Sequence, residues 1–221
     1  MTSSPYHHGN LREALVAAAV EAARANGPDG VALRELARTV GVSHSAAYRH
    51  FSHRDELLAA VAARGMAELV DAMQQRVDAV ERVATTDDVL RARRRLIAVG
   101  QGYVAFALNE PGLFRCAFAA KEAAGDPLVE PDANPYGLLS ETLDGLVEVG
   151  FLSPEAREGA EMTCWAVVHG FSALHLDGPL GAVDVAARDE TLDHVLAAID
   201  RSYAASTGTP IRPDDDIFAR V

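Results

Sequence analysis

Cysteine is scarce in this chain: two of its 221 residues are cysteines. Cys116 and Cys164 show no CxxC spacing and have no histidine at ligand spacing, so the sequence predicts two reduced, buried thiols and no redox or metal site. His7 and His8 adjoin each other but lack further ligands at suitable spacing. We therefore expect the protein to work without a metal or another cofactor.

Long apolar runs are missing as well, since no stretch approaches the roughly 20 apolar residues that span a bilayer. There is also no charged start followed by an apolar signal segment, so we expect a cytoplasmic protein without a membrane partner. Common enzyme motifs are equally absent: the sequence has no glycine-rich phosphate loop, no nucleophile elbow and no HExxH. The sequence therefore predicts a protein without catalytic residues.

Charge is unevenly divided along the chain, whose net charge is -12. Residues 1–65 contain seven arginines and six acidic residues, a balance of +1, so the remainder carries -13. Five of the eight histidines also lie in this first part. An acidic body repels nucleic acid, whereas a near-neutral part with arginine and histidine on one face can approach it.

The stretch 33–58 has the pattern of two short helices joined by a tight turn and followed by the start of a third. Apolar residues recur at helical spacing from Leu33 to Val40. Gly41 is placed to end this helix in the left-handed conformation, and Ser43 is placed to cap the next one. This arrangement predicts a helix-turn-helix.

The second of these helices, roughly 44–50, has an anchoring side with Tyr48 and Phe51 and a polar side that is left free. Its polar residues are Ser43, His44, Ser45, Tyr48, Arg49 and His50. Hydroxyl, imidazole and guanidinium groups on an exposed helix suit the major groove of DNA. The alternative is a helical hairpin buried in an ordinary bundle, which would not need so many polar groups.

Four pieces of this stretch together resemble the N-terminal signature of the TetR (tetracycline-repressor-like) transcriptional regulators. They are Leu36-Ala37, Gly41-Val42-Ser43, Tyr48-Arg49-His50-Phe51 and Glu56-Leu57-Leu58. The resemblance implies a DNA-binding dimer whose C-terminal helices hold a small ligand. By position it implies DNA contacts from Arg34, Ser43, His44, Ser45, Tyr48, His50 and Arg54. The chain departs from the pattern at Ala32, where a capping Ser or Thr is usual, and at Ala46, where a hydroxyl is common.

The parts around this motif follow from the same kind of pattern. Residues 1–9 are expected to form a flexible arm, either disordered or touching DNA beside the main site. Asn10 and Glu13 resemble a capping box that opens the first helix of a DNA-binding domain over 10–56. Residues 57–206 are expected to form a ligand-binding and dimerisation domain, and 207–221 a flexible tail.

Inside the second domain several helix boundaries are predicted. Ser52 is placed to cap a long helix that joins the two domains as one rigid rod. Gly100 and Gly102 lie inside a later helix, where each costs about 1 kcal/mol relative to alanine, so a close approach by another helix or a ligand is expected. A loop is expected over 126–135, and Ser153-Pro154-Glu155 is predicted to open the helix that contains CWAVVHGF.

In that helix Trp165 and His169 lie four residues apart on one face, with Met162 before them and Gly170 expected to permit close packing. Trp165, His169 and Gly170, with the N-terminal YHHGNLR, resemble a subgroup of these regulators called WHG. The last two long helices are expected to pair with their copies in a second subunit. The residues then left to line a ligand cavity are Tyr103, Phe106, Phe114, Phe118, Met162, Trp165 and His169. Core packing without ligand contact is the alternative for each.

The sequence thus predicts an all-α protein with a three-helix head and a helical-bundle body. The function that we expect is a homodimeric, ligand-responsive repressor that a small-molecule effector releases from double-stranded DNA with a palindromic operator. Two alternatives stay open at this point. One is an activator of the same fold, and the other is a helical small-molecule-binding protein whose DNA affinity is weakened by Ala32 and Ala46.

Overall fold

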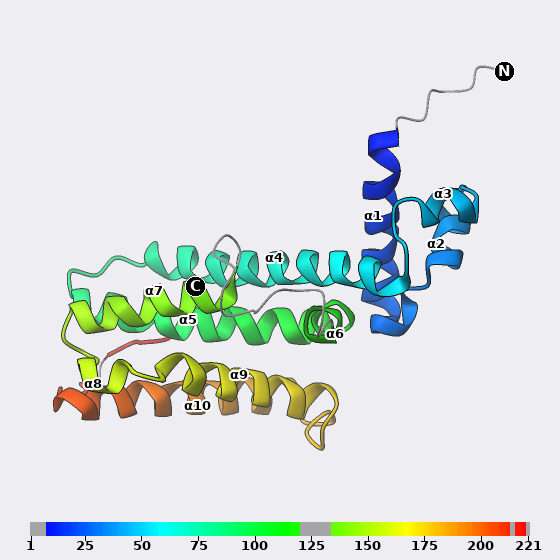
Figure 1. Ribbon diagram of the computed structural model, residues 1–221. Helices are drawn as coiled ribbons and strands as arrows, with labels where there is room; N and C mark the ends of the chain where they lie inside the picture. The colour runs from blue at the N-terminus through cyan, green and yellow to red at the C-terminus, as the bar shows by residue number, and fades with distance from the viewer. Residues whose placement is uncertain (1–7, 120–133, 213–214, 220–221) are drawn as a thin grey trace. The chain divides into compact units, whose positions relative to one another are not determined.

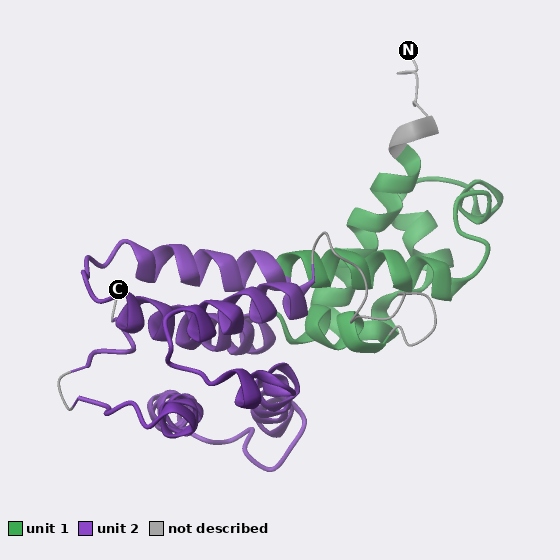
Figure 2. Ribbon diagram, turned by 60° about the vertical axis from the view of Figure 1, so that its left-hand side comes forward, with its two compact units in different colours: residues 1–68, 110–129 green, residues 69–109, 130–221 purple. Residues whose placement is uncertain are grey.

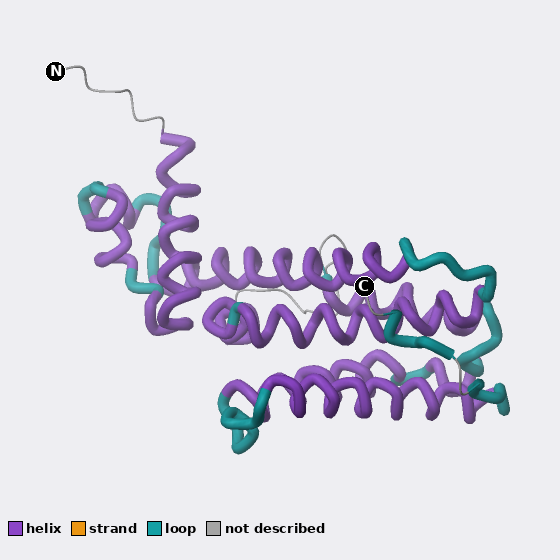
Figure 3. The backbone as a smooth tube through the Cα atoms, turned by 180° about the vertical axis from the view of Figure 1, so that it is seen from behind, coloured by secondary structure: helices purple, strands orange, loops and turns teal. Residues whose placement is uncertain are grey.

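The computed structural model describes residues 8–119, 134–212 and 215–219, and the regular structure in these ranges is helical, without strands (Figures 1 and 3). The elements are α1 (His8–Asn26), η1 (Gly27–Gly30), α2 (Leu33–Val40), α3 (His44–Tyr48), α4 (Arg54–Glu81), α5 (Asp88–Asn109), α6 (Pro111–Ala119), α7 (Pro135–Glu148), α8 (Pro154–Arg157), α9 (Ala160–Leu176) and α10 (Val185–Thr207). The all-α prediction is confirmed. No helix among these residues is long and apolar enough to cross a bilayer.

The chain divides into two compact units, coloured separately in Figure 2. The first, called the head below, comprises residues 1–68 and 110–129, and the second, called the body, comprises 69–109 and 130–221. The head therefore takes in α6 and the first half of α4, in addition to the expected range 10–56. Helix α4 runs without a break from one unit into the other.

In the head, α1 packs against η1, α2, α3 and α6. Gly112 lets α6 approach the backbone of α1 closely, because a Cβ there would collide with the carbonyl oxygens of Ala23 and Arg24. The Arg24 guanidinium adds an ion pair to Glu68 at 2.7 Å and another to Glu110. These contacts account for the assignment of α6 to the head.

The turn of the helix-turn-helix has the geometry that the sequence predicts. Gly41 ends α2 with φ +77°, in the left-handed region, and Ser43 caps α3 by accepting a hydrogen bond from the backbone N–H of Ala46 at 3.2 Å. Ala32 precedes α2 without any side-chain cap. All three predictions are confirmed.

Two predicted helix starts are wrong. Helix α1 begins at His8, so Asn10 lies inside the helix and does not cap it. Residues 8 and 9, expected in the flexible arm, belong to this helix, and residues 1–7 lie outside the described ranges. Helix α4 begins at Arg54, and its cap comes from His53, whose Nδ1 accepts the backbone N–H of Glu56 at 3.2 Å. Ser52 instead donates its backbone N–H to the Glu56 carboxylate at 2.7 Å.

In the body, α5 packs against α7, α9 and α10. A Cβ at Gly102 would lie 2.6 Å from Cα of Met73, and one at Gly100 would lie 2.7 Å from Cδ2 of Leu196. The close approach that the sequence predicts at these glycines is therefore confirmed. It brings α4 and α10 directly onto α5.

The helix predicted to start at Ser153 does not continue to CWAVVHGF. Ser153 caps the short α8 by accepting the Ala156 N–H at 3.2 Å. Gly159, with φ +76° in the left-handed region, then interrupts the helical path, and α9 begins at Ala160. Gly170 also differs from expectation, because a Cβ there would meet nothing within 4 Å in a single chain. Pro135, expected in a loop, is the first residue of α7; the rest of that loop, 126–133, lies outside the described residues.

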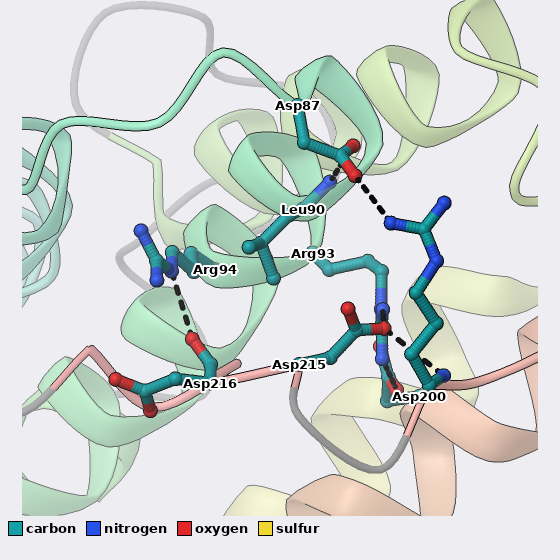
Figure 4. A network of polar contacts seen from close by, with 8 residues as sticks. Asp87, Leu90, Arg93, Arg94, Asp200, Asp215 and Asp216 are labelled. Carbon is teal, nitrogen blue, oxygen red and sulfur yellow. Dashed lines mark hydrogen bonds and ion pairs between the residues drawn. The ribbon is translucent and has the colours of Figure 1, made fainter.

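The C-terminal segment is packed where the sequence predicts a loose tail. Figure 4 shows Asp215 and Asp200 converging on the Arg93 guanidinium, at 2.5 Å and 2.9 Å. Nε of Arg94 donates to the backbone oxygen of Asp216 at 2.8 Å, and Ile217 is buried. Arg93 and Asp200 are themselves only 3% and 2% exposed, so this segment closes a buried network between α5 and α10.

Candidate nucleic-acid interface and ligand cavity

The polar residues predicted on and before α3 lie at the surface of the head. Most of them are exposed: Arg34, Ser43, His44, Ser45, Tyr48 and Arg49, with His50 half-buried. Tyr48 is 43% exposed and does not anchor the helix as expected. Phe51 is fully buried and anchors the helix as predicted, together with the fully buried Ala47, and the Arg12 guanidinium lies 4.9 Å over the Phe51 ring.

The Ser43 and Ser45 hydroxyls lie 3.1 Å apart, within hydrogen-bonding distance of each other. Because Ser43 also caps α3, its oxygen already serves the fold, whereas His44, Tyr48 and Arg49 keep exposed polar groups. The exposed side of α3 therefore offers imidazole, phenol and guanidinium groups to a partner. Such groups bond phosphate oxygens and the edges of bases.

Arg54 is exposed as well, but its guanidinium also serves the fold. Its Nε donates to the backbone oxygen of Val31 at 2.9 Å, and its Nη2 donates to that of Pro28. The guanidinium thus ties the first turn of α4 to the segment between α1 and α2. The sequence reveals the charge of Arg54, but it does not reveal that unpaired carbonyls lie next to it.

The body contains a cavity of about 40 Å³. Its lining is drawn from α4, α5, α7, α9 and α10, and it consists of Met73, Leu96, Ile97, Val99, Gly100, Tyr103, Pro135, Tyr136, Leu139, Cys164, Trp165, Val168, Leu196 and Ile199. Two of the seven predicted ligand residues, Tyr103 and Trp165, belong to this lining. Most of the others were recognisable in the sequence only as members of apolar helix faces.

His169 lies beside the cavity, and its Nδ1 is 2.8 Å from the Tyr103 hydroxyl. The rings of Tyr103 and His169 meet edge to face with centroids 6.4 Å apart. The rings of Tyr136 and Trp165 are 6.1 Å apart. The structure thus brings Tyr103, Trp165 and His169 together.

Four predicted ligand residues lie elsewhere. Phe106 is buried in the body but does not line the cavity. Phe114 and Phe118 belong to α6 in the head, where their ring centroids are 4.9 Å apart. Met162, near the start of α9, is 59% exposed and does not line the cavity. Their helical spacing was visible in the sequence, whereas the unit and the face to which each belongs depend on tertiary packing.

The polar groups at the cavity are uncharged near neutral pH. Burial raises the pKa of the Tyr103 phenol, although a hydrogen bond from Trp165 acts against it, and burial lowers the pKa of His169. Burial also raises the pKa of the Cys164 thiol, which lies 3.2 Å from the Tyr203 hydroxyl. Within the described residues, no three His, Cys, Asp or Glu side chains gather as a possible metal site.

Comparisons with known proteins cover both parts of the chain. Residues 15–61 match the family described as "Bacterial regulatory proteins, tetR family", and residues 96–199 match "Tetracyclin repressor-like, C-terminal domain". The HTH-type transcriptional regulator Rv1816 of Mycobacterium tuberculosis is 28% identical, with 78% of this chain and 85% of that protein aligned. YobS of Bacillus subtilis, an uncharacterized HTH-type regulator, is 27% identical over 75% of this chain and 79% of its own length.

Solved structures show the same fold. A protein of unknown function from Rhodococcus sp. RHA1 superposes with a TM-score of 0.62 at 29% identity, covering 93% of this chain and 99% of its own. A structure described as the molecular basis for control of antibiotic production by bacterial hormones gives a TM-score of 0.57 at 20% identity, covering 86% and 97%. With an exposed helix-turn-helix, a helical body and both family matches, the chain belongs to the TetR family of DNA-binding transcriptional regulators.

Proposed function

We propose that this regulator is a homodimeric repressor that leaves a palindromic operator when a small molecule enters the body. The observation that carries the proposal is the presence, in one chain, of an exposed polar α3 and an apolar cavity in a separate unit. The first can contact DNA without rearrangement. The second is lined by residues of helices that a ligand can displace.

A second copy of the chain would cover an apolar face that a single chain leaves open. On α9, Met162 and Leu174 are 59% and 45% exposed, and Gly170 leaves space beside its backbone. Val185, at the start of α10, is 58% exposed. A self-complementary interface on these helices would be isologous. It would present the two α3 helices to half-sites roughly one helical turn, about 34 Å, apart.

Helix α4 provides a continuous link between ligand and DNA. Its residue Met73 lines the cavity, and its first residue, Arg54, is hydrogen-bonded to backbone oxygens in the head. A ligand that displaces Met73 therefore acts on the same helix that holds the head together. It can shift the operator-bound form only by the difference in its affinity for the two forms.

The test combines gel retardation on the upstream DNA of the protein's own gene with a transcription assay in cells. A repressor retards that DNA, and deletion of its gene raises transcription from it. A fall in transcription on deletion would instead identify an activator of the same fold. Absence of DNA binding at low salt would favour the alternative of a helical ligand-binding protein. We expect His169→Ala to change release by an identified effector more than it changes operator affinity, since His169 lies in the body, 2.8 Å from the Tyr103 hydroxyl beside the cavity.

A further inference from the structure

The lining of the body cavity is apolar almost throughout. The described residues around it include no aspartate, glutamate, lysine or arginine. Most of the wall is aliphatic, and the lining also includes the side chains of Met73 and Cys164 and the three aromatic rings of Tyr103, Tyr136 and Trp165. Wall composition sets which ligands can enter, because a polar group that leaves water must find a partner inside.

Two buried charged residues that lie one turn from this lining are already paired. Arg93 precedes Leu96 by one turn of α5, but its guanidinium is held by Asp200 and Asp215. Glu161, one turn before Trp165 on α9, pairs with Arg157 at 2.6 Å. A charged ligand would therefore have to break one of these pairs or stay without a counter-charge, and either is costly in a buried site.

The polar atoms that do face this region are neutral. The Tyr103 hydroxyl and His169 Nδ1 share a hydrogen bond of 2.8 Å, and burial keeps the phenol protonated and the imidazole uncharged. Neutral hydrogen-bonding groups can orient a carbonyl or a hydroxyl. They cannot neutralise a carboxylate, a phosphate or an ammonium group.

The size of the cavity gives a second condition. Ligand sites commonly have volumes of about 300–1,000 Å³, whereas this cavity has about 40 Å³, so a ligand must separate side chains that now touch. The aromatic rings of the wall favour a flat, ring-containing molecule, because such rings stack or meet edge to face with little loss of contact.

We infer that the effector of this regulator is an uncharged, largely apolar, ring-containing small molecule. The inference rests on the proposed function only in calling that molecule an effector; the ligand class itself follows from the cavity wall. The same argument disfavours anions and cations as occupants of this cavity.

A matched pair of fluorescent dyes tests the class. N-phenylnaphthylamine is neutral, and anilinonaphthalene sulfonate has the same rings with one added anionic group. We expect the full-length protein to bind the neutral dye with a dissociation constant about tenfold or more below that of the sulfonate, since an uncompensated charge costs at least the 1.4 kcal/mol that corresponds to tenfold. Equal or tighter cavity binding of the sulfonate, or no binding of the neutral dye, would overturn the inference.

Variants establish that the dye occupies the cavity. Leu139→Trp places a large ring among the lining residues and should abolish binding of the neutral dye, whereas Ile211→Trp, at a 39% exposed position outside the lining, should leave it unchanged. If Leu139→Trp does not fold, Gly100→Ala serves, because its methyl pushes Leu196 toward the cavity and should weaken dye binding. If neither Leu139→Trp nor Gly100→Ala weakens dye binding, the dye binds elsewhere and the inference is refuted.

Operator retardation with and without the neutral dye separates this inference from the proposed function. Cavity-dependent dye binding with no DNA binding under any condition would support the ligand class and refute the repressor. If the protein binds operator DNA but takes up neither dye, the repressor is supported and the ligand class is refuted.

Discussion

The DNA-facing surface and the cavity are built in opposite ways. The residues of the surface lie within a short stretch, from Arg34 to His50, and most of them are exposed because the fold does not need their polar groups. The residues of the cavity extend from Met73 to Ile199 over five helices, and nearly all of them are also core residues. The surface can therefore change its specificity at little cost in stability, whereas any change in the cavity also changes the core.

One ion pair from each unit shows the same contrast between a buried and an exposed environment. In the body, Arg93 and Asp200 are almost fully buried. In the head, the Arg38–Glu35 pair at 2.5 Å has side chains that are 79% and 64% exposed. Solvent weakens the attraction within the exposed pair. In the buried pair the attraction is strong, but the loss of one partner leaves the other charge buried without compensation.

Arg93→Ala should have the largest effect, a loss of about 3–5 kcal/mol in the free energy of unfolding, because it leaves buried carboxylates without a counter-charge. It also removes the guanidinium that lies 4.9 Å over the Phe151 ring. Chemical denaturation followed by circular dichroism measures the loss. The matched control is Arg38→Ala, for which we expect a change below about 1 kcal/mol. Similar losses in the two variants would show that burial does not distinguish the pairs.

Asp215→Asn should cost about 1.5–3 kcal/mol, the range for hydrogen bonds to charged groups, and should flatten the acid dependence of stability. Burial alone would raise the pKa of Asp215, but hydrogen bonds from Arg93 and the Arg212 backbone N–H hold it below its ordinary value. The stabilisation is therefore complete above the unfolded-state pKa and is lost as the pH falls through the lower, folded-state pKa. Denaturation midpoints between pH 7 and pH 3 test this. An unchanged acid slope in the variant would show that another carboxylate sets it.

Tyr48→Ala should weaken operator binding by about 1–3 kcal/mol and leave the free energy of unfolding, the dimer and dye binding unchanged. The reason is that Tyr48 is exposed on α3 while the buried Ala47 and Phe51 hold the helix. Fluorescence anisotropy with operator DNA at fixed salt gives the affinity. Unchanged affinity would remove Tyr48 from the DNA-contacting set, and a fall in stability would show that it supports the head after all.

The sequence predicted the elements whose cause is local. Gly41 and Ser43 act through their own backbone conformation and hydroxyl, and the absence of a cap at Ala32 is visible directly. Gly100 and Gly102 were predicted to permit a close approach because a helix-interior glycine otherwise has only a cost. The partners in that approach, Met73 and Leu196, could not be predicted, since they come from distant helices.

What the sequence could not predict has the opposite cause. The C-terminal segment was predicted to be loose from its composition, yet Asp215 reaches Arg93 across more than a hundred residues of sequence. The backbone oxygens that Arg54 binds are likewise brought to it by tertiary structure. Met162 shared a helical face with Trp165 in the sequence, but in the structure it is exposed and does not line the cavity.

Ala32→Ser should have the smallest effect and the opposite sign, a gain of about 1 kcal/mol in the free energy of unfolding of the head. The two helices of the motif differ in that α3 has a hydroxyl cap and α2 has none. Ala32 already has the extended conformation of a capping residue, φ -119° and ψ 107°, so an added hydroxyl can accept the backbone N–H of Arg34 or Glu35 without rearrangement. Thermal unfolding should shift upward by about 2–4 °C. Ala32→Val, which adds bulk without an acceptor, should give no gain. An equal gain from valine would attribute the effect to packing, and the uncapped start of α2 would then have no energetic cost.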